Sequence, residues 1–172
     1  MPDTSNNAQI KAVVITVSDT RDEATDVSGV TLVGLLLGAG AEVVDKIIVS
    51  DDLEVLTAVL KKQAQRDGVN LILTTGGTGI AARDNTPEAT RAAIEKEIPG
   101  IAEAMRMETM KKTPTAILSR AVCGISGNCL IINLPGSPSG VRECFEIVSP
   151  VLNHAVNLLQ GKSAHDDNKQ IP

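Results

Sequence analysis

A strand that runs directly into a glycine-rich turn is the feature of this sequence that most constrains its fold. Residues 69–73 read V-N-L-I-L, and residues 74–87 continue as T-T-G-G-T-G-I-A-A-R-D-N-T-P. The apolar run predicts a strand, and the Thr-Pro pair predicts the start of a helix. A turn of this kind exposes backbone N–H groups beside the positive end of a helix dipole, which favours anion binding. Its glycines also let the backbone approach a ligand closely.

The turn resembles two standard nucleotide-binding motifs only in part. A P-loop requires Gly-Lys-Ser/Thr, but Gly79 is followed by Ile80, so that interpretation fails. Residues 77–82 do match the dinucleotide fingerprint G-x-G-x-x-A. However, they follow the third apolar run rather than the first, and Glu95 and Glu97 fall in a stretch with a helical pattern. A purely structural strand-to-helix turn remains the alternative to an anion site.

Apolar runs typical of strands alternate with segments of helical spacing along the chain. This order predicts an α/β fold with a mostly parallel sheet flanked by helices, plus one short β-hairpin turning at Gly127-Asn128. The expected strands are residues 11–17, 41–49, 70–75, 121–126 and 129–134, and the expected helices are 28–38, 53–66, 87–95, 99–111 and 138–160.

The length of 172 residues favours one domain. We expect a flexible N-terminus over residues 1–9, the folded domain over 10–160 and a flexible tail over 161–172.

Composition excludes several function classes. Phe145 is the only aromatic residue, so the core is expected to be aliphatic and bases cannot stack on an aromatic platform. A net charge of −5 without a long basic run argues further against nucleic-acid binding. The polar N-terminus leads us to expect no signal sequence, and no apolar run approaches membrane-spanning length. Three sparse cysteines are typical of free buried thiols in a reducing cytoplasm.

Polar residues follow four of the predicted strands. Because the carboxyl ends of parallel strands meet at one edge of a sheet, Asp51 and Asp84 are expected to face one cleft although 33 residues separate them. Two carboxylates beside an anion site favour a bound cation. The alternative is that each aspartate only caps the N-terminus of a helix. Asp52, next to Asp51, could be either the functional carboxylate or the cap.

Other polar residues leave similar alternatives open. Asp19 and Asp26 could be simple turn formers, which is the favoured interpretation for Asp26. Ser119 and Arg120 could hold an anion. Ser137 is expected to cap the last helix, although that helix start also suits a phosphate.

Several motifs resemble those of the molybdopterin-binding proteins of molybdenum-cofactor synthesis, the MogA and MoaB type, which include domains of gephyrin. The matching segments span about residues 10–160 and are V-S-D at 17–19, D-V-S-G at 26–29, T-T-G-G-T-G at 74–79, R-D at 83–84, T-P-E-A at 86–89, L-S-R at 118–120 and N-L-P-G-S-P at 133–138. Asn85 departs from the Val or Lys that is commoner in the family.

The resemblance implies a three-layer α/β fold, a homotrimer and a molybdopterin adenylyltransferase. This activity transfers AMP from ATP to the terminal phosphate of molybdopterin with Mg²⁺, and pyrophosphate leaves. It implies Asp51 and Asp84 as catalytic residues and as Mg²⁺ ligands. The candidates for substrate and phosphate binding are Ser18, Asp19, Thr75, Gly76, Gly77, Thr78, Gly79, Ser119, Arg120, Pro135, Gly136 and Ser137.

Two other functions stay open. A MoaB-type protein could bind molybdopterin as a carrier or scaffold without catalysis, alongside other molybdenum-cofactor biosynthesis proteins. A related domain of the competence/damage-inducible proteins belongs to a nucleotide-pyrophosphatase class, but those chains normally carry more sequence than the 172 residues here.

Overall fold

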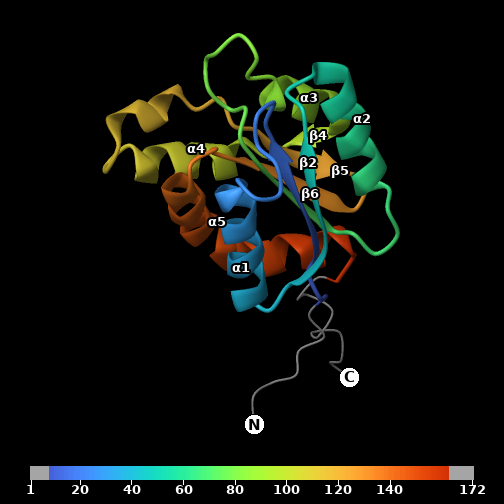
Figure 1. Cartoon of the computed structure of the whole chain (residues 1–172). Coiled ribbons are helices and arrows are strands. Elements are labelled where there is room, and N and C mark those ends of the chain that lie inside the picture. Colours follow the sequence, from blue (N-terminus) through green and yellow to red (C-terminus); the bar gives the residue numbers. More distant parts are fainter. Residues whose placement is uncertain (1–7, 163–172) are drawn as a thin grey trace, which may run out of the picture.

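The computed structural model describes residues 8–162 as three layers, with helices on both faces of one sheet (Figure 1). The expected flexible segments 1–9 and 161–172 fall largely outside the described residues. Among the described residues, Ala8 is buried, and its backbone N–H donates to Asn157 Oδ1 at 2.7 Å.

The sheet has six strands in the order β2-β1-β3-β6-β5-β4. Four of them are mutually parallel, namely β1 (Lys11–Val17), β2 (Glu42–Val49), β3 (Leu71–Thr75) and β6 (Cys129–Leu134). The antiparallel pairs are β5 (Cys123–Ser126) with β6 and β4 (Lys96–Glu97) with β5. The predicted hairpin is therefore confirmed, and Gly127 takes the positive φ of +57° that its turn requires.

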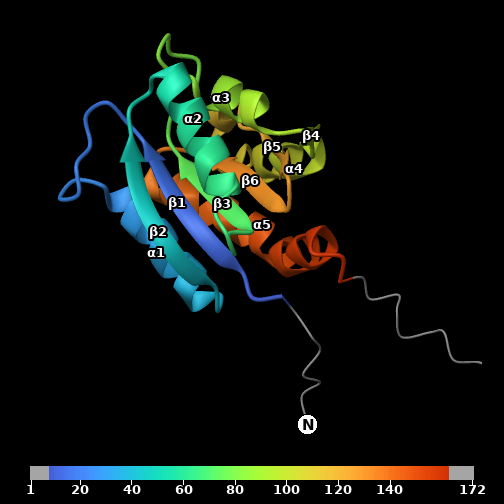
Figure 2. The ribbon, with the colours of Figure 1, turned by 90° about the vertical axis from the view of Figure 1, so that its right-hand side faces the viewer.

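The helices divide between the two faces of the sheet, as Figures 1 and 2 show. On one face lie α1 (Val27–Gly38), α4 (Pro99–Thr109) and α5 (Pro138–Leu159). On the other face lie α2 (Leu53–Ala64) and α3 (Thr86–Ala93). A short 3₁₀ helix, η1 (Pro114–Leu118), follows α4.

The side chains of each central strand point alternately to the two faces of the sheet, so each strand contributes to the hydrophobic core on both faces. Ala12 and Val14 of β1 face α1 and α5, whereas Val13 and Ile15 face α2 and α3. Such strands read as continuous apolar runs because both of their faces are buried. The core is aliphatic as expected, with Phe145 as its single aromatic residue.

Two sequence expectations need correction here. Glu97 is not helical: it lies in β4 and pairs with Gly124 of β5. The helix expected over 87–95 ends at Ala93. The strand expected over 121–126 begins at Cys123. Short exposed strands such as β4 carry no periodic signal, because their pairing is decided by a partner distant in the sequence.

Candidate active site

The loops that follow β1, β2, β3 and β6 all emerge at the carboxyl edge of the parallel strands. This edge is where open α/β sheets bind ligands, because the strand ends leave a crevice between loops. The edge therefore gathers the loops 18–26, 50–52, 76–85 and 135–137 around one region.

The turn after β3 needs its first two glycines for steric reasons. Gly76 and Gly77 have φ of +102° and +66°, in the left-handed region that glycine tolerates. A Cβ at Gly76 would lie 2.4 Å from the carbonyl oxygen of Val17, and one at Gly77 would lie 2.4 Å from Thr86 Oγ1. The expected close approach is thus an approach to neighbouring protein atoms.

The same turn leaves donors free for a ligand. The N–H of Gly76 donates to the carbonyl of Leu134, and the carbonyls of residues 76–79 accept hydrogen bonds from Thr86 and Arg120. Among the described residues, the N–H groups of Gly77, Thr78 and Gly79 have no hydrogen-bond partner within the protein. Consecutive free N–H groups of this kind form an anion-binding concavity.

The carboxylates of Asp51 and Asp84 flank this turn. A Cβ added at Gly77 would lie 2.9 Å from Asp51 Oδ1, and one at Gly79 would lie 2.8 Å from Asp84 Oδ2. Burial raises the pKa of Asp51 above its usual value, and the nearby charges of Asp19 and Asp84 raise it further. The structure therefore places both predicted carboxylates at the glycine turn, close enough to repel each other.

Neither aspartate is a helix cap. Asp52 caps α2, because its side chain accepts a hydrogen bond from Val55 N at 2.9 Å. At the start of α3 the N-cap position belongs to Asn85, which makes no side-chain cap bond. Asp84 instead accepts a hydrogen bond from Ala81 N at 2.9 Å within its own loop.

Asp19 connects the first loop to the other two. Its Oδ1 accepts a hydrogen bond from Asp51 N at 3.0 Å, and its Oδ2 pairs with the guanidinium of Arg83. The hydrogen bond from Arg83 and the N–H of Asp51 hold the pKa of Asp19 below its usual value. Ser18 lies beside it and accepts from the N–H groups of Thr20 and Arg21 at 3.2 and 3.1 Å.

The interpretation of Asp26 as a turn former is wrong. Asp26 is buried, caps α1 through Gly29 N at 2.9 Å, and accepts hydrogen bonds from Thr16 and Lys46 at 2.8 and 2.9 Å. Burial raises its pKa, but the hydrogen bonds from Lys46, Gly29 and Thr16 outweigh burial and lower the pKa overall. This aspartate anchors the first loop to β1 and β2.

Residues 135–137 are fixed by neighbouring loops. Thr75 Oγ1 donates to the carbonyl of Pro135 at 2.7 Å. The carbonyl of Gly136 accepts from Arg21 Nη2 at 2.8 Å and from Ser28 Oγ at 2.7 Å. Ser137 caps α5 through Gly140 N at 3.1 Å, as expected.

A pocket of about 400 Å³ adjoins the glycine turn on the side of α4 and α5. Five predicted residues line it, namely Thr78, Gly79, Ser119, Pro135 and Ser137. Asp51 and Asp84 are not among the residues that line it. Gly79 connects the two parts of the site, because it lines the pocket and lies close to Asp84.

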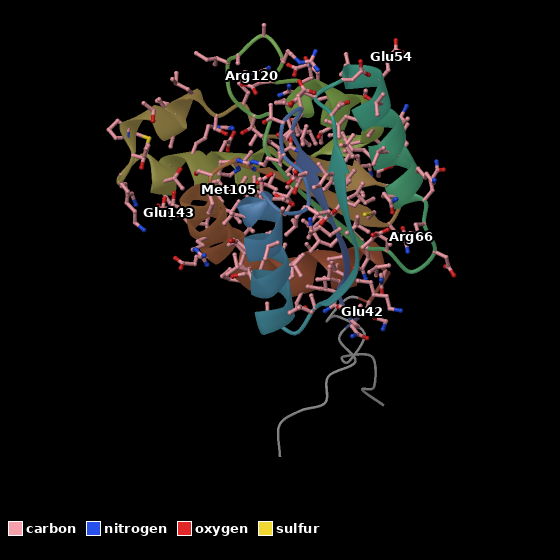
Figure 3. The ribbon with its side chains drawn as sticks, in the orientation of Figure 1. Glu42, Glu54, Arg66, Met105, Arg120 and Glu143 are labelled. Carbon is pink, nitrogen blue, oxygen red and sulfur yellow. The ribbon has the colours of Figure 1, made fainter. Side chains whose placement is uncertain are left out.

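Sequence reasoning missed several residues of this pocket. Met105, Arg106 and Thr109 enter it from α4, and Glu143 and Cys144 enter it from α5. Figure 3 labels Met105 and Glu143 on these two helices. The apolar spacing of α4 is the same whether a residue faces the core or a pocket, so the sequence held no signal that separates them.

Asp51 and Asp84 are the side chains of this site that would hold a bound Mg²⁺. Across residues 8–162, no group of three or more His, Cys, Asp and Glu side chains is arranged to hold a metal ion. Mg²⁺ commonly takes one or two carboxylates and completes its shell with water and substrate phosphates, so a larger protein cage is not required. Burial and neighbouring negative charge raise the pKa of Asp51, and a cation beside it would neutralise that charge.

Residues 13–154 match the family model described as a probable molybdopterin binding domain, and the chain belongs to this family. It is 45% identical over 124 residues to a molybdopterin adenylyltransferase of Helicobacter pylori strain J99, covering 72% of this chain and 70% of that protein. It is also 45% identical over 151 residues to the molybdenum cofactor synthesis protein cinnamon of Drosophila melanogaster. That match covers 85% of this chain but only 25% of the fly protein.

A solved structure has the same fold. The molybdopterin biosynthesis enzyme MoaB of Thermus thermophilus superposes with a TM-score of 0.82 at 45% identity, covering 90% of this chain and 98% of that one. The α/β fold expected from the sequence and the family resemblance are both confirmed.

Proposed function

We propose that this protein is a molybdopterin adenylyltransferase of molybdenum-cofactor biosynthesis. The observation that carries the proposal is the row of free N–H groups at Gly77, Thr78 and Gly79, which lies close to two carboxylates and adjoins a pocket of about 400 Å³. The 45% identity to a relative named for this activity supports it.

The chemistry brings two anions together. A terminal phosphate oxygen of molybdopterin attacks the α-phosphorus of ATP, the bond to the β-phosphate breaks, and pyrophosphate leaves with the bonding electrons. Charge neutralisation and positioning dominate such a transfer, and no amino-acid nucleophile is needed.

Each part of the site has a role in this proposal. The turn N–H groups bind phosphate oxygens, and Asp51 and Asp84 would hold Mg²⁺. When bound, Mg²⁺ supplies positive charge to the transferring phosphate groups. The remaining candidates form the surface that would contact the substrates, or hold its loops in place. They are Ser18, Asp19, Thr75, Gly76, Ser119, Pro135, Gly136 and Ser137.

A molybdopterin-dependent pyrophosphate-release assay tests this function. We expect release only when ATP, molybdopterin and Mg²⁺ are all present. Absence of release at every Mg²⁺ concentration, with molybdopterin bound, would instead indicate a carrier.

That carrier is the second candidate. Molybdenum cofactor biosynthesis protein B of Staphylococcus aureus strain Mu50 is 42% identical over 158 residues, covering 89% of this chain and 94% of that protein. A protein of this type would hold molybdopterin in the same pocket without consuming ATP.

We also propose that the protein assembles as a homotrimer. Val27, Val30 and Leu37 of α1 are 57%, 57% and 56% exposed, which is unusual for large apolar side chains on one helix. A homotrimer would cover such a surface and have a mass of 3 × 18.0 = 54 kDa. Light scattering that returned 18 kDa at working concentration would remove the trimer.

The proposal extends to the domain and to its cellular compartment. We propose that residues 10–160 act as one domain in the cytoplasm and receive molybdopterin from other cofactor-synthesis proteins. Cys123, Cys129 and Cys144 are free and buried, which supports a reducing compartment. Among residues 8–162, no helix combines the length and apolar character needed to cross a bilayer.

A further inference from the structure

One guanidinium group holds both ends of the loop that carries Asp84. Arg120 donates from Nε to the carbonyl of Gly79 at 2.7 Å and from Nη2 to the carbonyl of Asp84 at 2.6 Å. Its Nη1 pairs with Glu88 Oε1 on α3, and its backbone N–H donates to the carbonyl of Thr78 at 2.8 Å. Figure 3 labels Arg120 close to the loop that joins β3 to α3.

These contacts connect the two ends of the turn formed by residues 79–84. Within it, Asp84 N donates to the carbonyl of Ala81 at 3.0 Å, and Ala81 N donates to Asp84 Oδ2 at 2.9 Å. The carboxylate of Asp84 is therefore oriented by the turn, and the two ends of the turn are held at a fixed separation by Arg120. Gly79, which carries one of the free N–H groups, is at one of those ends.

The expectation that Arg120 holds a substrate anion has to be weighed against these contacts. All three guanidinium nitrogens already have protein partners. Burial raises the pKa of Glu88, but the hydrogen bond and positive charge of Arg120, a backbone hydrogen bond and the charge of Arg91 together lower this pKa below its usual value. Glu88 therefore stays ionised beside the guanidinium and offsets its charge, which weakens any attraction for a phosphate.

We propose that Arg120, seated by Glu88, is a positioning residue that sets the orientation of Asp84 and of the Gly79 N–H for catalysis. The proposal rests on the adenylyltransferase function above. It does not make Arg120 a catalytic residue, because its effect on the reaction passes through the loop.

The geometry requires an arginine. A planar guanidinium can reach two carbonyls and a carboxylate in fixed directions at once, whereas an ammonium group is a point donor on a flexible stem. Arg120→Lys keeps the charge and can keep the ion pair with Glu88, but it cannot hold both carbonyls. It therefore separates loop positioning from simple charge balance.

The kinetic test compares Arg120→Lys with Arg91→Lys. Arg91 lies on α3 and pairs with Glu97 at 3.8 Å, so it is an arginine–glutamate pair away from the loop. We expect Arg120→Lys to melt close to wild type but to lose about 10–100-fold in kcat, the size of effect that a misplacement of about 1 Å produces. Arg91→Lys should keep wild-type kinetics.

Chemical rescue separates positioning of the loop from a purely structural role, because added guanidinium ion should restore kcat only if the guanidinium group itself positions the loop. Arg120 is 36% exposed at its side chain, so free guanidinium ion can reach the space left by Arg120→Ala. We expect guanidinium chloride at low concentration to restore part of the kcat of Arg120→Ala, and ammonium chloride to restore none. Wild-type kcat in Arg120→Lys, or a loss confined to KM for ATP, would overturn the proposal.

Hydrogen exchange tests the loop without any substrate. Amides of residues 79–84 should exchange faster in Arg120→Lys than in wild type, and the same amides should be unchanged in Arg91→Lys. Equal exchange in all three proteins would overturn the positioning role. If wild type forms no adenylylated product, the proposed function fails, and this experiment still decides whether Arg120 holds the loop.

Discussion

The side-chain amide of Asn85 donates a hydrogen bond to the backbone carbonyl of Asp51 at 2.8 Å. This bond joins the loop after β3 to the loop after β2, and so links the two segments that carry Asp84 and Asp51. A side chain without an N–H donor could not make this link.

Replacing Asn85 by Ala should loosen this link. We expect the free energy of unfolding to fall by about 0.5–1.5 kcal/mol, the net value of one hydrogen bond. Turnover should fall several-fold, because the two carboxylates lose a fixed separation. Urea denaturation and steady-state kinetics check both effects, and unchanged kinetics would show that the carboxylates are positioned without Asn85.

Asp51→Asn and Asp84→Asn should each reduce turnover by orders of magnitude. Asparagine keeps the size of the side chain but removes the charge that a cation or a developing phosphate charge requires. Folding should be kept, since neither residue caps a helix. Variants that fold and turn over at the wild-type rate would leave only a structural role for these aspartates.

The stability of Asp51→Asn should depend on pH in a defined direction. The pKa of Asp51 is raised in the folded state, so its ionised form is less favourable there than in the unfolded chain. Above that raised pKa, wild type should therefore be less stable than the variant. The difference should shrink as pH falls and Asp51 takes up its proton, which thermal melts at a series of pH values measure.

Gly77→Ala should destabilise the fold and reduce activity together. Its Cβ would collide with Thr86 Oγ1 and press on Asp51, at a φ of +66° that alanine rarely adopts. We expect a loss of roughly 1–3 kcal/mol. The matched control is Gly100→Ala in α4, where an added Cβ meets nothing within 4 Å and about 0.4–1 kcal/mol of stabilisation is expected.

The sequence located the buried elements well, because their signals are local. Continuous apolar runs marked β1, β3 and β6, and Gly127-Asn128 marked the hairpin. The two-residue strand β4 was missed, since only its pairing with β5 defines it.

Side-chain roles at the site were harder to predict. Asp26 bonds to Lys46, which is 20 residues away, and Arg120 bonds to Gly79, which is 41 residues away. Such partners are fixed by the tertiary fold and leave no periodic pattern in the chain. The positions of Asp51 and Asp84 could be anticipated only because strand ends share an edge.

Magnesium should raise the melting temperature of the wild-type protein. A cation held by Asp51 and Asp84 binds the folded state alone, and at about 100 times its dissociation constant it would add about 2.7 kcal/mol. The Asp51→Asn/Asp84→Asn double variant should show no such increase. Equal responses of both proteins to MgCl₂ would place the cation elsewhere.

Mass spectrometry of the product tests the central claim most directly. Wild type is incubated with molybdopterin, ATP and Mg²⁺, and the pterin is then analysed beside a reaction run with the Asp51→Asn/Asp84→Asn double variant. We predict that molybdopterin gains one AMP unit with wild type, that pyrophosphate appears in equal amount, and that the double variant forms neither. Molybdopterin recovered unchanged from the wild-type reaction, with ATP intact, would contradict the adenylyltransferase function.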